Sequence, residues 1–146
     1  LDLHDYLARR LQRVQNSCIR FIFNLRYSEH ITPYIQRLGW FNLKTLRQYN
    51  ILITLFKVCV THRPPYLYSR LTFQHDVHSL NTRSRQSSIL SIPAHKTNYY
   101  SSSFTVTATR FWNDIPEEIR HATSVAMFKN ALKAHLLQNT YQCDNQ

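Results

Sequence analysis

A chain of 146 residues, 43% of them hydrophobic and 13% aromatic, is long enough to bury one core but short for two. The 18 Lys+Arg against 8 Asp+Glu give a formal net charge of +10, which favours polyanionic partners over basic ones. The longest apolar run, residues 51–60, is interrupted by Thr54 and Lys57 and is too short to span a bilayer. No run in this sequence therefore predicts a transmembrane helix.

The positive charge is concentrated in the middle of the sequence. Between Tyr6 and Asn113 there are 15 Lys+Arg and two acids, and arginines outnumber lysines 13 to 5 over the whole chain. The planar guanidinium suits phosphate oxygens and stacked bases better than an ammonium does. Nucleic acid is therefore the leading partner class, while an anionic membrane surface and an acidic protein partner are alternatives at this stage.

The first predicted element is an amphipathic helix over residues 5–25. Its apolar residues share one face at helical spacing: Leu7, Leu11, Val14, Cys18, Phe21, Ile22 and Leu25. Arg9, Arg13 and Arg20 lie on the opposite face, with Asn16 and Asn24 between them and no acid. This cationic face is either a phosphate-binding surface or a solvated one, and the lack of interleaved Glu weakens the second interpretation.

A short second helix is predicted to begin at Thr32-Pro33, where a hydroxyl able to cap precedes a proline suited to the first turn. It ends at Gly39, the one glycine of the sequence, which suits a left-handed C-terminal turn. Trp40 and Phe41 follow, and we expect both aromatic side chains to anchor this turn in the core.

Asn42 can cap a third helix over residues 43–62, whose apolar residues cover most of its circumference. Such a helix is typical of a domain centre. Pro64-Pro65 ends it, and residues 66–71 have room for one more turn.

Residues 72–103 lack helical periodicity and predict a long loop, with room for one short strand near residues 88–92. The loop contributes three further candidate nucleic-acid-binding residues: Arg83, Arg85 and Lys96. Tyr99 and Tyr100 either stack on bases or anchor the loop in the core.

Helical spacing returns in residues 104–112, although several β-branched residues there favour a strand. Pro116-Glu117-Glu118 predicts a further turn, and Ser124 can cap a last helix. The predicted fold is mostly α, a small orthogonal or irregular bundle of about five helices with the loop over residues 72–103. We expect one domain over residues 1–138, followed by a polar tail over residues 139–146.

Catalytic and metal-binding patterns are weak in this sequence. The three cysteines are separated by 41 and 84 positions, so they do not form a zinc finger. His75 and His78 have only Asp76 nearby, and the acids Asp114, Glu117 and Glu118 are better explained as helix-start residues than as metal ligands. We therefore expect no independent enzyme, no metal, no cofactor and no small-molecule ligand.

Several short blocks resemble the region downstream of the reverse transcriptase domain in non-LTR (LINE-type) retrotransposons, particularly jockey-like elements. In the first half they are Leu11-Gln12-Arg13-Val14-Gln15-Asn16, Arg20-Phe21-Ile22, His30-Ile31, Leu38-Gly39-Trp40 and Pro65-Tyr66-Leu67. In the second half they are Thr82-Arg83-Ser84, Ile92-Pro93, residues 100–104, Arg110-Phe111-Trp112-Asn113-Asp114-Ile115-Pro116 and Phe128-Lys129-Asn130-Ala131-Leu132-Lys133. Each block is short, but they follow one another in order over residues 11–137.

The resemblance implies a segment that follows the palm and thumb of a polymerase. The catalytic aspartates of such an enzyme, in a Tyr-x-Asp-Asp turn, would lie upstream of Leu1, and the cysteine-histidine knuckle of some relatives is missing here. The sequence starts at Leu1 and its one methionine is Met127, so we expect a piece of a longer reading frame.

The sequence therefore predicts a non-catalytic accessory region of a reverse transcriptase that binds RNA template or target DNA backbone and braces the upstream polymerase domain. The candidate contacts are Arg9, Arg13, Arg20, Arg83, Arg85 and Lys96. One alternative is a helical protein-interaction module without nucleic-acid contact, and another is a remnant of a 5′-truncated element. The odd number of cysteines favours a reducing, intracellular location, in cytoplasm and nucleus, and no membrane partner is expected.

Overall fold

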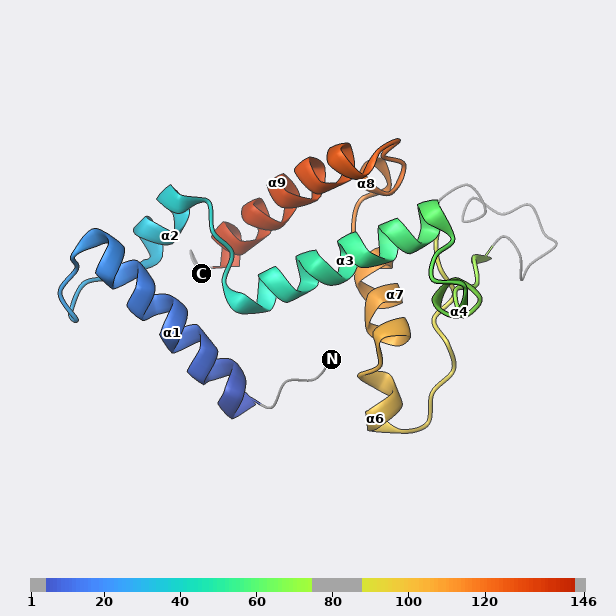
Figure 1. The fold of residues 1–146 in the computed structure, drawn as a ribbon, viewed down its shortest axis with the longest axis horizontal. Coiled ribbons are helices and arrows are strands. Elements are labelled where there is room, and N and C mark those ends of the chain that lie inside the picture. The colour runs from blue at the N-terminus through green and yellow to red at the C-terminus, as the bar shows by residue number, and fades with distance from the viewer. Residues whose placement is uncertain (1–4, 75–87, 144–146) are drawn as a thin grey trace. The chain divides into compact units, whose positions relative to one another are not determined.

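The computed structural model describes residues 5–74 and 88–143, with side chains described to residue 139. The described chain is mostly helical, as predicted (Figure 1). Five helices are longer than one turn: α1 (Asp5–Phe23), α2 (Thr32–Leu38), α3 (Leu43–Thr61), α7 (Phe104–Asp114) and α9 (Val125–Cys143). Three more have four residues each: α4 (Pro65–Tyr68), α6 (Asn98–Ser101) and α8 (Glu117–Arg120). No helix in this described part has the length and apolarity needed to cross a membrane.

Within the predicted domain the backbone packs as two compact units. Among the described residues, unit 1 comprises residues 48–135, and unit 2 comprises residues 5–47 and 136–143. Helices α3 and α9 each contribute to both units. Helix α9 continues to Cys143, so residues 139–143 of the predicted tail are helical.

An aromatic cluster forms the centre of unit 1. Phe56 of α3 stacks on Phe128 of α9 with ring centroids 4.1 Å apart, and Trp112 of α7 lies 6.0 Å from Phe128. All three rings are buried, and Leu52, Leu55, Val106 and Leu132 surround them with little or no exposed surface. Burial of such large apolar side chains is the main stabilising contribution available to a unit of this size.

Helix α7 holds the segment that follows the undescribed part of the loop. Leu90 donates its N–H to Asn113 Oδ1 at 3.0 Å, and Asn113 Nδ2 donates to the Leu90 carbonyl at 2.9 Å. Trp112 Nε1 donates to the Ser88 carbonyl at 2.8 Å. Leu90 also pairs with Phe73 in an isolated antiparallel bridge. The short strand predicted near residues 88–92 is therefore reduced to one bridge, because side chains of α7 replace a neighbouring strand.

The predicted helix ends are partly confirmed. Asn42 Oδ1 accepts from the N–H of Thr45 at 2.8 Å, and Ser124 Oγ accepts from the N–H of Met127 at 3.2 Å, so both residues cap as expected. Gly39 has φ +60°, the predicted left-handed C-cap. The prediction for Thr32 was wrong, because Ile31 occupies the N-cap position and makes no side-chain cap hydrogen bond.

Unit 2 packs α1 against α2 through the rings of Phe23 and Tyr34, whose centroids lie 4.9 Å apart. Helix α1 ends at Phe23, two residues before the predicted end, because Asn24 adopts a left-handed conformation with φ +50°. Phe41 is buried, as predicted, but Trp40 is exposed, so its predicted anchoring role was wrong.

The apolar face of α1 is mostly exposed. Leu7, Leu11, Val14, Cys18, Phe21 and Ile22 are all exposed. The residue of α1 that is buried is Ile19, and two polar side chains that precede it on the same side of the helix make hydrogen bonds to other parts of unit 2. Gln15 Nε2 donates to the Phe41 carbonyl at 2.7 Å, and Gln12 Oε1 accepts from the Leu43 N–H at 3.0 Å. Because these contacts lie roughly 100° around the helix from the apolar face, that face is left uncovered.

Candidate nucleic-acid interface

In unit 2 the predicted arginines share one face of α1. Arg9, Arg13 and Arg20 are spaced by four and seven residues, so their side chains leave the helix on the same side. From Arg9 to Arg20 this face is roughly 16 Å long at 1.5 Å per residue. Arg9 and Arg13 are exposed, and among the described residues no carboxylate lies within ion-pair distance of either guanidinium. These two side chains are therefore available to an anion in solvent.

Arg20 has a different environment. One of its terminal nitrogens donates to the Arg26 carbonyl, and the other donates to the Glu29 carbonyl at 2.9 Å. Its guanidinium also lies over the Tyr27 ring, 5.4 Å from the centroid. Both terminal nitrogens of the Arg20 guanidinium therefore bond to the turn that follows α1. Arg20 is therefore primarily a structural residue, and Arg9 and Arg13 carry the accessible charge of this face.

In unit 1 the candidate Lys96 is exposed in the segment before α6, beside an ordered histidine. Arg110 of α7 places Nη2 2.9 Å from His95 Nε2, and His95 Nδ1 lies 3.0 Å from the Pro93 carbonyl. Since a guanidinium only donates, Nε2 accepts and the ring proton is on Nδ1, where it is donated to Pro93. This chain of hydrogen bonds fixes the backbone that carries Lys96.

The tyrosines next to Lys96 are on the surface. Tyr99 is 93% exposed and Tyr100 is also exposed, so neither anchors the loop in the core. Thr97 caps the short helix α6 by accepting from the N–H of Tyr100 at 3.2 Å, which holds both aromatic residues beside Lys96. An exposed lysine and an exposed ring within four residues of one another offer the two groups that single-stranded nucleic acid uses, a phosphate partner and a stacking surface.

The candidates belong to separate parts of the chain. Arg9, Arg13 and Arg20 lie in unit 2, Lys96 lies in unit 1, and Arg83 and Arg85 lie outside the described residues, as do His75 and His78. The structure adds Arg10, exposed and 5.6 Å from the centroid of the Tyr6 ring, and Arg110 beside His95. Arg110 is 15 residues from His95, so no local pattern in the sequence could have paired them.

No catalytic arrangement is visible in the described part of the chain. There, no three or more His, Cys, Asp or Glu side chains gather where they could hold a metal ion. Glu117 and Glu118 lie in the first turn of α8, and Glu117 Oε1 is 3.4 Å from His121 Nε2. Burial raises the pKa of the Cys59 thiol to about 11, which disfavours the thiolate and makes Cys59 a poor nucleophile.

Comparisons with protein-family models, with curated proteins and with solved structures find no match to this chain.

Proposed function

We propose that the chain is a non-catalytic accessory region of a non-LTR retrotransposon reverse transcriptase, and that it binds the backbone of RNA or DNA without sequence preference. The observation that carries the binding proposal is the pair of exposed arginines on α1, Arg9 and Arg13, with no carboxylate partner among the described residues. The ordered succession of sequence blocks supports the assignment to this class of element.

The Lys96 segment, in unit 1, is a second and separate candidate contact. Its backbone is held by His95 and Arg110, and it presents an exposed amine three residues before the exposed ring of Tyr99. Phosphate contacts of this kind release counterions, and each contributes roughly 0.7 to 0.9 to the slope of log affinity against log salt. With Arg9, Arg13 and Lys96 engaged, we expect micromolar binding and a slope of about −2 to −3.

The test is fluorescence anisotropy with labelled single-stranded RNA, single-stranded DNA and duplex DNA, at salt concentrations from about 50 to about 200 mM. The double variant Arg9→Glu/Arg13→Glu should bind about tenfold more weakly or worse, and its salt slope should be shallower by about 1.5.

The matched control is Lys129→Glu/Lys133→Glu on α9, which changes the net charge by the same amount without altering any of the proposed contact residues. We expect the nucleic-acid affinity of this control to fall by less than about threefold, because only the overall electrostatic attraction is reduced. Equal losses in the two double variants would show that net charge, rather than the α1 face, determines binding. An affinity that is flat with salt would rule out backbone contact altogether.

A further inference from the structure

The exposed apolar side chains of α1 form a continuous seam. Leu7, Leu11, Val14, Cys18 and Phe21 follow one another at spacings of four, three, four and three residues. Leu11 is 50% exposed, Val14 60% and Phe21 88%. We call these five residues the α1 seam. Contiguous apolar surface of this kind is uncommon on soluble proteins unless it is an interaction site.

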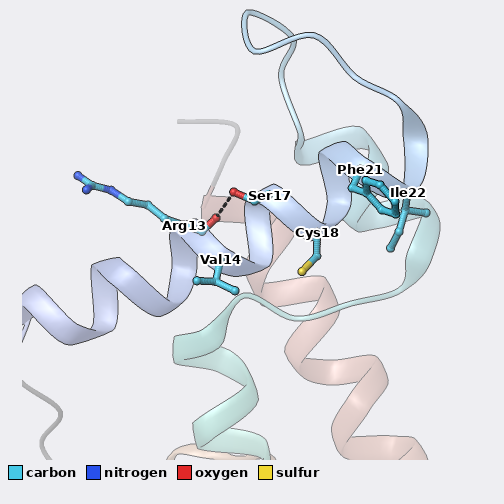
Figure 2. A pocket seen from close by; sticks show the side chains of 6 residues that line it. All are labelled: Arg13, Val14, Ser17, Cys18, Phe21 and Ile22. Carbon is cyan, nitrogen blue, oxygen red and sulfur yellow. Dashed lines mark hydrogen bonds between the residues drawn. The ribbon is translucent and has the colours of Figure 1, made fainter.

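The seam borders an open groove of about 450 Å³ along α1, lined by Arg13, Val14, Ser17, Cys18, Phe21 and Ile22. Figure 2 shows Val14 and Cys18 directed to one side of the helix, one turn apart, and Arg13 directed away from them. The Ser17 hydroxyl donates to the Arg13 carbonyl at 2.9 Å, so it makes its polar contact within the helix. The groove is therefore apolar along its floor and cationic at its edge.

The spacing of the seam favours a helix as its occupant. Apolar residues that alternate at four and three residues form the narrow stripe that one helix buries against another in a coiled coil. A helix that inserts into a lipid surface also has a charged face opposite its apolar one, as α1 has, but it buries a broader apolar face. On α1 one side of the seam is bordered by Gln12 and Gln15, which bond to Leu43 and Phe41, and by the buried Ile19. An apolar stripe confined in this way is suited to one partner helix.

The arginines beside the seam indicate what charge a partner helix should carry. Arg10 precedes the seam residue Leu11 and lies at the edge of the seam, and Arg13 lines the groove beside Val14. Helix α1 has four arginines and one acid, Asp5, in its first turn. A second copy of α1 would bring arginines against arginines, which is unfavourable. An acidic flank would pair with them.

We infer that the α1 seam is a docking site for an amphipathic helix of a protein partner, one with an apolar stripe of the same spacing and glutamate or aspartate along its flank. The apolar contacts of the seam lie on the side of α1 opposite Arg9 and Arg20, and Arg13 is the one residue that the groove shares with the proposed nucleic-acid contacts.

The experiment uses the full chain and a labelled synthetic helix of about four heptads, with leucine at the stripe positions and glutamate along both flanks. A second peptide has lysine in place of every glutamate. We expect saturable binding of the acidic peptide and at least about tenfold weaker binding of the basic one. Bound peptide should also slow alkylation of Cys18, which is exposed in the seam and can be followed by mass spectrometry.

The seam variant is Leu11→Ser/Val14→Ser, and its matched control is Val60→Ser/Met127→Ser. Val60 and Met127 are 55% and 57% exposed on α3 and α9, so both variants remove two half-exposed apolar side chains. The seam variant should bind the acidic peptide about tenfold more weakly or worse, whereas the control should stay within about twofold of the parent. Circular dichroism checks that both variants keep their helix content.

Four outcomes would overturn the inference. They are equal binding of the two peptides, equal losses in the two double variants, self-association in sedimentation that the seam variant abolishes, and seam-dependent binding to phosphatidylserine vesicles without peptide binding. The seam variant keeps all four arginines of α1, so it should lose peptide binding and retain nucleic-acid affinity, and the two proposals fail separately.

Discussion

At the scale of single residues, identical side chains on one helix face have different roles. Arg9 and Arg20 leave α1 on the same side, yet Arg9 is exposed while Arg20 donates to two carbonyls of the turn that follows the helix. The sequence predicted both as phosphate ligands, because spacing determines the face of a helix. Which of them has a partner depends on where residues 24–31 run, and spacing carries no information on that path.

The two described cysteines should differ in their effect on stability at alkaline pH. The Cys59 thiol ionises near pH 9 when the chain is unfolded, but burial raises its folded pKa to about 11. Between these values the unfolded chain loses the proton and the folded chain keeps it, so stability falls as pH rises through this window. Each pH unit is worth at most about 1.4 kcal/mol, and we expect a loss of about 1–2 kcal/mol in all.

The measurement is urea unfolding at about pH 8 and about pH 10.5, with Cys59→Ala and, as control, Cys18→Ala. Cys59→Ala should lose part of the pH dependence, whereas the variant of the exposed Cys18 should keep it. If both variants have the parent's pH dependence, Cys59 does not contribute to it.

At the scale of secondary-structure elements, side chains at the end of α7 make hydrogen bonds to the backbone of residues 88–90 that a second strand would otherwise make. Asn113 satisfies both the N–H and the carbonyl of Leu90, and Trp112 satisfies the carbonyl of Ser88. Leu90 has no exposed surface, so its backbone groups need partners within the protein. The block over residues 110–116, one of those on which the family resemblance rests, therefore has a structural role that explains its Trp-Asn pair.

Replacement of Asn113 should destabilise unit 1. Asn113→Ala removes two hydrogen bonds and leaves two buried backbone groups of Leu90 unpaired, for which we expect a loss of about 2–3 kcal/mol in the free energy of unfolding. Asn113→Asp keeps the acceptor but sets a carboxylate oxygen against the Leu90 carbonyl, so it should not restore the stability.

Urea unfolding followed by circular dichroism measures these losses. The control is Asn130→Ala on the exposed side of α9, which should change stability by less than about 0.5 kcal/mol. A loss at Asn113 no larger than at Asn130 would show that the Leu90 backbone finds other partners.

At the scale of the whole molecule, charge should make folding depend on salt. The net charge is +10, and each described exposed arginine of α1 lacks a carboxylate partner among the described residues. Repulsion among like charges destabilises the folded state, and salt screens it. We expect the urea midpoint to rise between about 20 and about 300 mM NaCl, by the equivalent of about 1 kcal/mol.

This dependence is opposite in sign to that proposed for nucleic-acid affinity, which falls with salt because counterions are released. The parent and Arg9→Glu/Arg13→Glu should therefore be compared in both assays. A midpoint that falls with salt would mean that attractive ion pairs outweigh repulsion in the folded chain.

The sequence by itself determined the helical class, the positions of the five longer helices, and caps such as Asn42, Gly39 and Ser124. These signals act over one or two turns, so a local pattern contains them in full. The tertiary structure decided which face of α1 is covered, because Gln15 donates to the Phe41 carbonyl and Gln12 accepts from the Leu43 N–H, so contact with this segment is made from the glutamine side of the helix. The tertiary structure also gave Arg20 hydrogen-bond partners that Arg9 lacks, and it placed Arg110 within hydrogen-bond distance of His95. Both contacts depend on the path of backbone that is distant in the sequence.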